Sequence, residues 1–251
     1  MQHKLLETWG KGNGAINAWL AIPNAITAEI AAMQDFDSVT IDLQHGLNDY
    51  QIALSMLQAV STSDKTAMVR VPWNEPGIIM KLLDAGALGV ICPMINTRAD
   101  AEAFVGACRY TPEGYRSAGP TRAMLIHGAD YIAKANDAVV TLAMIETREA
   151  LENVTDIVAT PGLTGIYVGP SDLSLSLGYG PGMDHTKPEM VAAIMQIRDA
   201  CKEAGIKIGI HCGSTEYARK MIAEGFDLTT ISSDLRAYAA ARGQITTEMR
   251  A

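Results

Sequence analysis

The sequence has few cysteines and no stretch long and apolar enough to cross a membrane. Its four cysteines lie far apart, at Cys92, Cys108, Cys201 and Cys212. This spread is typical of reduced thiols rather than of a disulfide framework. No run approaches the roughly 18 apolar residues of a membrane helix, and the first twenty residues lack the apolar core of a signal peptide. We therefore expect a cytoplasmic protein that is neither exported nor inserted into a membrane.

The chain also lacks a block of positive charge. Lys and Arg number 20 and Asp and Glu number 28, so the net charge is 20 − 28 = −8. A protein that follows a nucleic-acid backbone needs clustered basic residues to neutralise the phosphates. No such cluster is present, and the composition argues against nucleic acid as a partner.

Short runs rich in Val and Ile alternate with helical stretches along the whole sequence. This order is typical of parallel strands joined by crossover helices. Several helical stretches end in glycine, which can close a helix in a left-handed conformation, as at Gly86, Gly205 and Gly225. Strands are predicted at residues 17–22, 38–43, 66–71, 89–94, 140–145, 165–169, 206–211 and 228–232. Eight strands in 251 residues predict one α/β domain over residues 1–251, a closed (β/α)8 TIM barrel.

The segment between Arg109 and Val140 interrupts this alternation. Loops of that length are usually functional or lie at interfaces. Because the segment follows a helix, it begins on the face opposite the expected active site. Arg116 and Arg122 would therefore reach an active site only over a long distance or in a neighbouring subunit. A purely structural or interfacial loop is an equally good interpretation.

Carboxylates follow two neighbouring predicted strands at the point where each strand ends. Glu146 comes directly after an apolar run, and Asp172 follows the next strand in Gly169-Pro170-Ser171-Asp172. Neighbouring parallel strands lie about 4.8 Å apart, so these two acids can share one divalent cation such as Mg²⁺ or Mn²⁺. The alternative is that Ser171 and Asp172 cap the next helix. Capping does not require both acids at the same barrel face, so we predict a metal pair.

Three more ionisable groups are candidates for the chemistry. His45 follows the second strand in Asp42-Leu43-Gln44-His45-Gly46 and is placed to act as a base. Arg70 lies within an apolar strand, where it needs an anionic ligand or a structural partner such as Asp42. Asp84 lies near a helix end, where the helix dipole disfavours its charge. It is a candidate partner for His45, although a histidine satisfied within its own loop is the simpler interpretation.

Five ordered motifs resemble those of the HpcH/HpaI aldolase family, the metal-dependent class II pyruvate aldolases. The similarity extends from Trp19 through the eighth strand, and the motifs occupy residues 42–46, 69–76, 82–86, 145–147 and 169–174. The resemblance implies a TIM barrel of the phosphoenolpyruvate/pyruvate superfamily. It also implies that Glu146 and Asp172 bind Mg²⁺, Mn²⁺ or Co²⁺, that Arg70 contacts the substrate keto oxygen, and that His45 and Asp84 form the acid/base dyad.

The implied reaction is the reversible cleavage of a 4-hydroxy-2-oxo acid into pyruvate or hydroxypyruvate and an aldehyde. The resemblance further implies that the backbone amides of Ser171 and Asp172 bind the substrate carboxylate. It implies a homohexamer, a trimer of dimers with a swapped C-terminal helix. Trp19 and His211 are our candidates for substrate contacts at the aldehyde pocket, with packing as the alternative for Trp19.

Two departures from the family pattern concern the substrate. Met144 stands where some members carry Gln, and residues 44–46 read Gln-His-Gly rather than the Glu-His-Ala of the heptanedioate aldolases.

Three other functions are alternatives to a metal-dependent aldolase. A Schiff-base aldolase needs a lysine at the active face, but Lys207 lies at the beginning of its strand. An acyl-CoA lyase of the citrate or malyl type would need a basic surface, and a non-catalytic 2-oxo-acid-binding barrel would not need His45.

Overall fold

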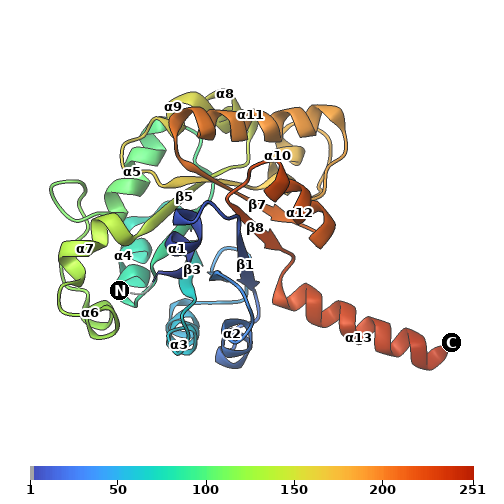
Figure 1. The fold of residues 1–251 in the computed structure, drawn as a ribbon, viewed down its shortest axis with the longest axis horizontal. Helices are drawn as coiled ribbons and strands as arrows, with labels where there is room; N and C mark the ends of the chain where they lie inside the picture. The colour runs from blue at the N-terminus through green and yellow to red at the C-terminus, as the bar shows by residue number, and fades with distance from the viewer. Residues whose placement is uncertain (1–2) are drawn as a thin grey trace.

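Eight parallel strands form a closed barrel in the computed structural model, which describes residues 3–251 (Figure 1). Each strand pairs with the next one along the chain, and the last pairs with the first. The strands are β1 (Ala15–Leu20), β2 (Ser38–Asp42), β3 (Thr66–Arg70), β4 (Gly89–Cys92), β5 (Val140–Ile145), β6 (Gly165–Val168), β7 (Lys207–Cys212) and β8 (Leu228–Ile231). Every predicted strand overlaps one of these, so the (β/α)8 barrel is confirmed.

Helices connect the strands, and most of them surround the barrel. They are α1 (Lys4–Gly10), α2 (Ala25–Ala32), α3 (Tyr50–Val60), α4 (Pro76–Asp84), α5 (Arg98–Cys108), α6 (Thr121–His127), α7 (Tyr131–Ala138), α8 (Arg148–Glu152), α9 (Val154–Val158), α10 (Pro170–Ser176), α11 (Pro188–Ala204), α12 (Thr215–Ala223) and α13 (Asp234–Arg250). Gly205 closes α11 in the left-handed region, with φ of 70°, as predicted from its position after the helical stretch. None of the described helices is long and apolar enough to cross a membrane.

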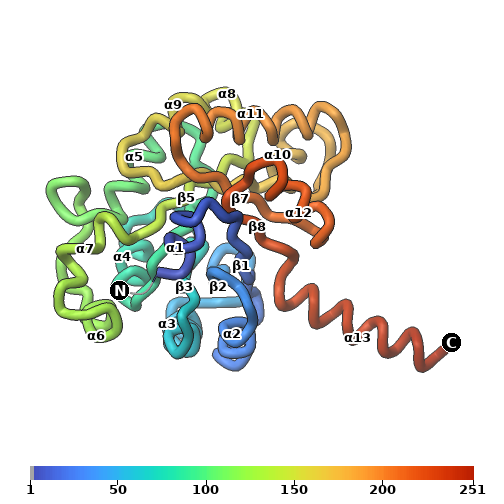
Figure 2. The backbone as a smooth tube through the Cα atoms, viewed as in Figure 1, coloured from blue at the N-terminus to red at the C-terminus, as the bar shows by residue number. Residues whose placement is uncertain are grey.

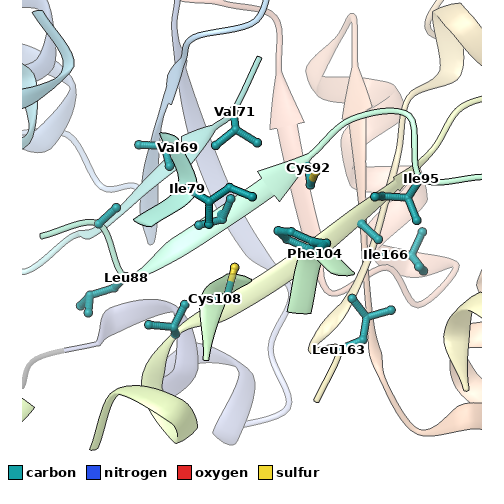
Figure 3. Packing of buried hydrophobic residues seen from close by; sticks show 14 of the residues in the cluster. Val69, Val71, Ile79, Leu88, Cys92, Ile95, Phe104, Cys108, Leu163 and Ile166 are labelled. Atoms are coloured by element: carbon teal, nitrogen blue, oxygen red, sulfur yellow. The ribbon is translucent and has the colours of Figure 1, made fainter. Parts of the chain in front are cut away.

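Buried apolar residues form two clusters. The larger one lies between the strands and the surrounding helices, and Figure 3 shows part of it around Val69, Ile79 and Phe104. The smaller one fills the barrel interior and includes Trp19 and Tyr167. Strands supply both clusters because successive side chains point to opposite faces of the sheet. The interior cluster also contains Leu5 and Trp9 from α1, so this helix closes the amino end of the barrel.

The segment between Arg109 and Val140 contains α6 and α7, so part of the predicted loop is helical. Arg116 is buried, and its Nη2 donates to Asp84 Oδ1 at 2.7 Å. The guanidinium of Arg122 donates to the Ala85 carbonyl oxygen. Both arginines therefore attach the segment to the end of α4.

The C-terminal helix α13 extends away from the barrel, and none of its residues is buried (Figures 1 and 2). Ser233 caps it, accepting a hydrogen bond from the Arg236 amide at 3.3 Å. Asp234 begins the helix, and its Oδ1 accepts from the Ala21 amide at 2.7 Å, which ties the start of α13 to the end of β1. The exchange of this helix between subunits stays a prediction.

Candidate active site

A cavity of about 440 Å³ opens at the carboxyl ends of the strands. In a parallel barrel these ends meet on one face, and side chains that follow different strands converge there. The cavity is lined by six of the residues predicted from the sequence, which are Trp19, His45, Arg70, Ser171, Asp172 and His211. Met144, one of the two departures from the family motif, lines it as well. The strand-end reasoning therefore placed most of the candidates in one site.

Arg70 and Asp42 form a buried ion pair in the cavity wall. The Nε and Nη2 atoms of Arg70 donate to Asp42 Oδ1 and Oδ2 at 2.8 and 2.6 Å. Burial alone would raise the pKa of Asp42, but the hydrogen bonds and charge of Arg70 hold that pKa below its ordinary value. The alternative of a structural pair is thus observed. The Arg70 Nη1 makes no hydrogen bond within residues 3–251 and is not enclosed, so one donor is left for a ligand oxygen.

Asp42 also organises its surroundings, a role that the sequence did not suggest. Its Oδ2 accepts a hydrogen bond from Trp19 Nε1 at 3.2 Å, and its Oδ1 accepts from the Gln44 amide at 3.0 Å. The Arg70 guanidinium lies 4.8 Å from the centre of the Trp19 ring, within the range of a cation–π contact. One carboxylate thereby fixes the indole, the guanidinium and the loop that carries His45.

Glu146 is buried behind the cavity, with 2% of its surface exposed. Its Oε1 accepts from the Met94 amide at 2.8 Å. A side chain at Gly169 would lie 2.6 Å from Glu146 Oε2, so glycine is needed there for close approach. Burial raises the pKa of Glu146 to about 7, and the charge of Asp172 adds to this effect. Two carboxylates that repel each other in this way are suited to a shared cation.

The donor set at this position fits a hard divalent cation. Among the described residues there is no group of three or more His, Cys, Asp and Glu side chains placed to hold a metal. A site built on Glu146 and Asp172 therefore leaves most of the coordination shell to water and substrate. Mg²⁺ and Mn²⁺ are typically bound in this manner, whereas a structural zinc site needs four protein ligands.

The backbone of Met94 is part of this arrangement and was missed by the sequence reasoning. Met94 has φ of 56°, a left-handed conformation that non-glycine residues seldom adopt. Thr147 Oγ1 donates to Asn96 Oδ1 at 2.5 Å, and Asn153 Nδ2 donates to the Asn96 carbonyl oxygen at 2.9 Å. These bonds join the loop after β4 to the helices after β5, so the Met94 amide is held against Glu146.

Ser171 and Asp172 lie in the first turn of α10, directly after Gly169 and Pro170. No side chain caps this helix, which removes the capping interpretation of Ser171 and Asp172. Asp172 is exposed and Ser171 is half-buried, and both line the cavity. Their carboxylate and hydroxyl groups are therefore available to a cation or substrate.

His45 and Asp84 are not joined within one chain. His45 is exposed at the cavity rim. Helix α4 runs back from the carboxyl ends of the strands, so Asp84, its last residue, lies near the start of β4. There the Asp84 carboxylate is bonded to Arg116 and lines a different hollow, beside Lys81 and Arg122. The predicted dyad has no counterpart among the contacts of residues 3–251.

No lysine lines the cavity among the described residues. Lys207 lies at the beginning of β7, and its Nζ is bonded to Asp227 Oδ1 at 2.8 Å. Lys207 therefore lies at the amino end of the barrel, as predicted from its position in the sequence. A Schiff-base mechanism has no candidate lysine in this cavity.

Three comparisons with known proteins agree with this geometry. Residues 16–241 match the model of the HpcH/HpaI aldolase/citrate lyase family. A hydroxypyruvate/pyruvate aldolase of Rhizorhabdus wittichii is 44% identical over 99% of each chain. A 4-hydroxy-2-oxo-heptane-1,7-dioate aldolase of Salmonella dublin is 35% identical, covering 97% of this chain and 95% of that one. A crystal structure of a family protein from Burkholderia cenocepacia superposes with a TM-score of 0.88, at 31% identity over 95% of each chain.

Proposed function

Because the chain belongs to the HpcH/HpaI aldolase/citrate lyase family, we propose that it is a divalent-metal-dependent class II aldolase. It reversibly cleaves a 4-hydroxy-2-oxo acid to an aldehyde and either pyruvate or hydroxypyruvate. One observation carries this assignment: Arg70, Asp172 and His45 line one cavity, with Glu146 buried behind it. The relatives at 44% and 35% identity are both named as aldolases, which favours this reaction over an acyl-CoA lyase.

Glu146 and Asp172 are the residues proposed to hold the cation, with Mg²⁺, Mn²⁺ or Co²⁺ as candidates. When bound, the cation supplies Lewis acidity for the negative charge that develops on the keto oxygen. Glu146 is held for this role by the Met94 amide. Asp172 is on the cavity side and exposed, so the pair presents oxygen atoms from two adjacent strands.

Arg70 is proposed to bind the keto oxygen of the 2-oxo acid. Asp42 fixes the guanidinium through two hydrogen bonds, so its remaining donor is oriented before the substrate arrives. Preorganised donors of this kind stabilise developing negative charge without a cost of reorientation. The backbone amides of Ser171 and Asp172 are proposed to bind the substrate carboxylate, since no side chain caps their helix.

His45 is proposed as the acid and base. In cleavage, a ring nitrogen of His45 takes the proton of the C4 hydroxyl, the C3–C4 bond breaks, and its electron pair passes to the 2-oxo acid as an enolate. His45 then returns this proton to C3 of the enolate, which gives the free 2-oxo acid. In condensation the same nitrogen removes a C3 proton and passes it to the new C4 hydroxyl. Asp84 is bonded to Arg116 at the other end of its own barrel. Its predicted contact with His45 therefore requires a second copy of the chain, in keeping with the proposed homohexamer.

A coupled assay tests the proposal. The purified chain should release pyruvate from a 4-hydroxy-2-oxo acid, chelator should abolish the release, and Mg²⁺, Mn²⁺ or Co²⁺ should restore it. Borohydride added with pyruvate should leave the activity intact, because no Schiff base is formed. Irreversible inactivation by borohydride would contradict the metal mechanism. Binding of pyruvate without turnover of any tested 4-hydroxy-2-oxo acid would instead support a binding protein.

A further inference from the structure

A column of buried polar side chains runs through the barrel interior below the cavity. Asn17 on β1 is at its centre and is fully buried. The Oδ1 of Asn17 accepts hydrogen bonds from Ser38 Oγ at 2.8 Å and Thr40 Oγ1 at 2.9 Å. The Nδ2 of Asn17 donates to Thr230 Oγ1 at 2.9 Å. The column therefore connects β1 with its two neighbouring strands, β2 and β8, inside the barrel.

Tyr167 joins this column to His211. The Tyr167 hydroxyl donates to Thr230 Oγ1 at 2.8 Å and lies 3.2 Å from His211 Nδ1. A phenol has one proton, and Tyr167 uses it toward Thr230. The Tyr167 oxygen then accepts a hydrogen bond from the Nδ1–H group of His211. This network assigns the neutral tautomer of His211 in which Nε2 carries the lone pair.

The His211 side chain lines the cavity, and its Nε2 is not among the unpaired polar atoms that the protein encloses. Within residues 3–251 this atom makes no hydrogen bond shorter than 3.5 Å, and the nearby Ser232 backbone makes only the smallest of the contributions to the pKa of the ring. His211 lines the cavity together with Trp19 and Arg70. Burial lowers the pKa of His211 to about 4, and the neighbouring Arg70 acts in the same direction. The ring is therefore neutral near pH 7, and Nε2 is a hydrogen-bond acceptor.

The hydrogen-bonded column ends at a histidine in the cavity wall, and core packing alone does not explain why buried polar residues lead to that point. The apolar cluster around it includes Met68, Ile91 and Leu142, and buried polar groups in such surroundings are costly unless they are paired. A satisfied network fixes the orientation of its members. Here the last member, His211, has a free acceptor that faces the substrate cavity. Asn17, Thr230 and Tyr167 are thus positioning residues for that acceptor.

The place of His211 indicates which part of a substrate it meets. Its ring lies edge-on to Trp19, with 5.0 Å between ring centres, and the Arg70 guanidinium lies 4.8 Å from the same indole. Arg70 is the proposed partner of the keto oxygen on C2. With the C1 carboxylate at the Ser171 and Asp172 amides, as proposed above, C3 is the other carbon bonded to C2, and the hydroxyl that distinguishes hydroxypyruvate from pyruvate is on C3.

We propose that His211 Nε2 accepts a hydrogen bond from the C3 hydroxyl of the 2-oxo acid and thereby selects hydroxypyruvate over pyruvate as the nucleophile. This inference rests on the proposed aldolase function and adds a specificity residue to it. A site built to bind a hydroxyl discriminates against the analogue that lacks it, because the polar group of the site is then left unpaired. The Rhizorhabdus wittichii relative is named for both nucleophiles, so both are suitable probes.

The experiment compares kcat/KM for hydroxypyruvate and for pyruvate, with acetaldehyde as the common acceptor and Mn²⁺ in excess. In the wild type the ratio should favour hydroxypyruvate. His211→Leu, which removes the acceptor, should lower that ratio about tenfold or more. His211→Gln supplies another acceptor and should retain a higher ratio than His211→Leu. Circular dichroism shows whether each variant is folded.

Tyr167→Phe tests the positioning role without removing the imidazole. It should lower the ratio less than His211→Leu, and the nitrogen-15 shifts of His211 should show the loss of the single Nδ1-protonated tautomer. If the wild type turns over neither nucleophile, the proposed function fails. If the wild type is an aldolase but its ratio is unchanged in a folded His211→Leu variant, only this inference is overturned. A wild-type spectrum with protonated Nε2 would also overturn it.

Discussion

Among residues 3–251, two arginine–aspartate pairs with a buried guanidinium differ in where they lie. Arg70 and Asp42 end adjacent strands at the cavity, whereas Arg116 and Asp84 join a loop to the end of α4. The N–O distances are 2.6 and 2.7 Å, so local chemistry does not separate them. Only the first pair leaves a donor open toward the cavity, since Arg116 Nη1 donates to Tyr131 and its Nε is enclosed. Position relative to the strand ends decides which pair is available for catalysis.

The sharpest test of this difference is the loss of Arg70. Arg70→Ala should lower kcat/KM about 10³-fold, because it removes a fixed donor for the developing negative charge. Arg70→Lys keeps the charge but not the two-point contact with Asp42, and it should recover only part of the activity. Steady-state kinetics measures both variants. Arg98→Ala on the exposed end of α5 is the matched control. An Arg70→Ala enzyme with more than a tenth of wild-type activity would show that the Arg70–Asp42 pair is not needed for catalysis.

Loss of Arg116 should affect the fold first. Its guanidinium is fully buried, and Asp84 keeps a quarter of its side chain exposed. Arg116→Ala leaves that carboxylate unpaired and empties space against Tyr110 and Tyr131. The free energy of unfolding should fall by about 3 kcal/mol. Denaturant titration at pH 7 measures this change. A stability equal to the wild type would mean that the pair is not a structural anchor.

The proposed metal ligands Glu146 and Asp172 also lie at strand ends, after β5 and β6, so their loss should affect activity as the loss of Arg70 does. Asp172→Ala should weaken Mn²⁺ binding by about 100-fold or more and should lower activity with it, because one of two proposed ligands is lost. Electron paramagnetic resonance of free Mn²⁺ gives the affinity without reference to turnover. Asp156→Ala, an exposed aspartate on α9, is the control. Unchanged Mn²⁺ affinity in Asp172→Ala would remove this residue from the proposed site.

The strand-borne groups were predictable because one rule places them. An ionisable residue at the end of an apolar parallel strand, or shortly after it, lies at the active face, and this identified Arg70, Glu146 and Asp172 as candidates for one site. The same rule does not reach Asp84. Its helix returns the chain to the opposite face, so a partner there belongs to another part of the molecule or to another copy.

Other parts of the site had no signal in the sequence. Met94 contributes a backbone amide, and its left-handed φ is not encoded by a glycine. Asn17 is the one polar residue of β1, Thr230 follows Thr229 in β8, and nothing local indicates that the two meet on neighbouring strands. Such contacts join residues 213 positions apart in the chain, so they appear only when the ring of strands is closed.

Replacement of a single buried histidine should have the smallest effect, and the two candidates lie at opposite ends of the barrel. Burial lowers the pKa of His3 at the amino end and of His211 at the cavity to about 4, from an ordinary value of 6.5. Each imidazole is more basic in the unfolded chain, which therefore binds more protons between these two values. Stability must then fall as the pH decreases from 6.5 toward 4.

From pH 7 to pH 5 each histidine should contribute about 2 kcal/mol to this loss. His211→Gln and His3→Gln should each flatten the pH dependence of the unfolding free energy by about that amount, and the double variant should flatten it by the sum. Urea titrations at pH 7, 6 and 5 measure the slopes. Equal slopes in the wild type and the double variant would show that neither imidazole is kept neutral by the fold. If only His3→Gln changes the slope, His211 is more open to water than its place in the cavity wall indicates.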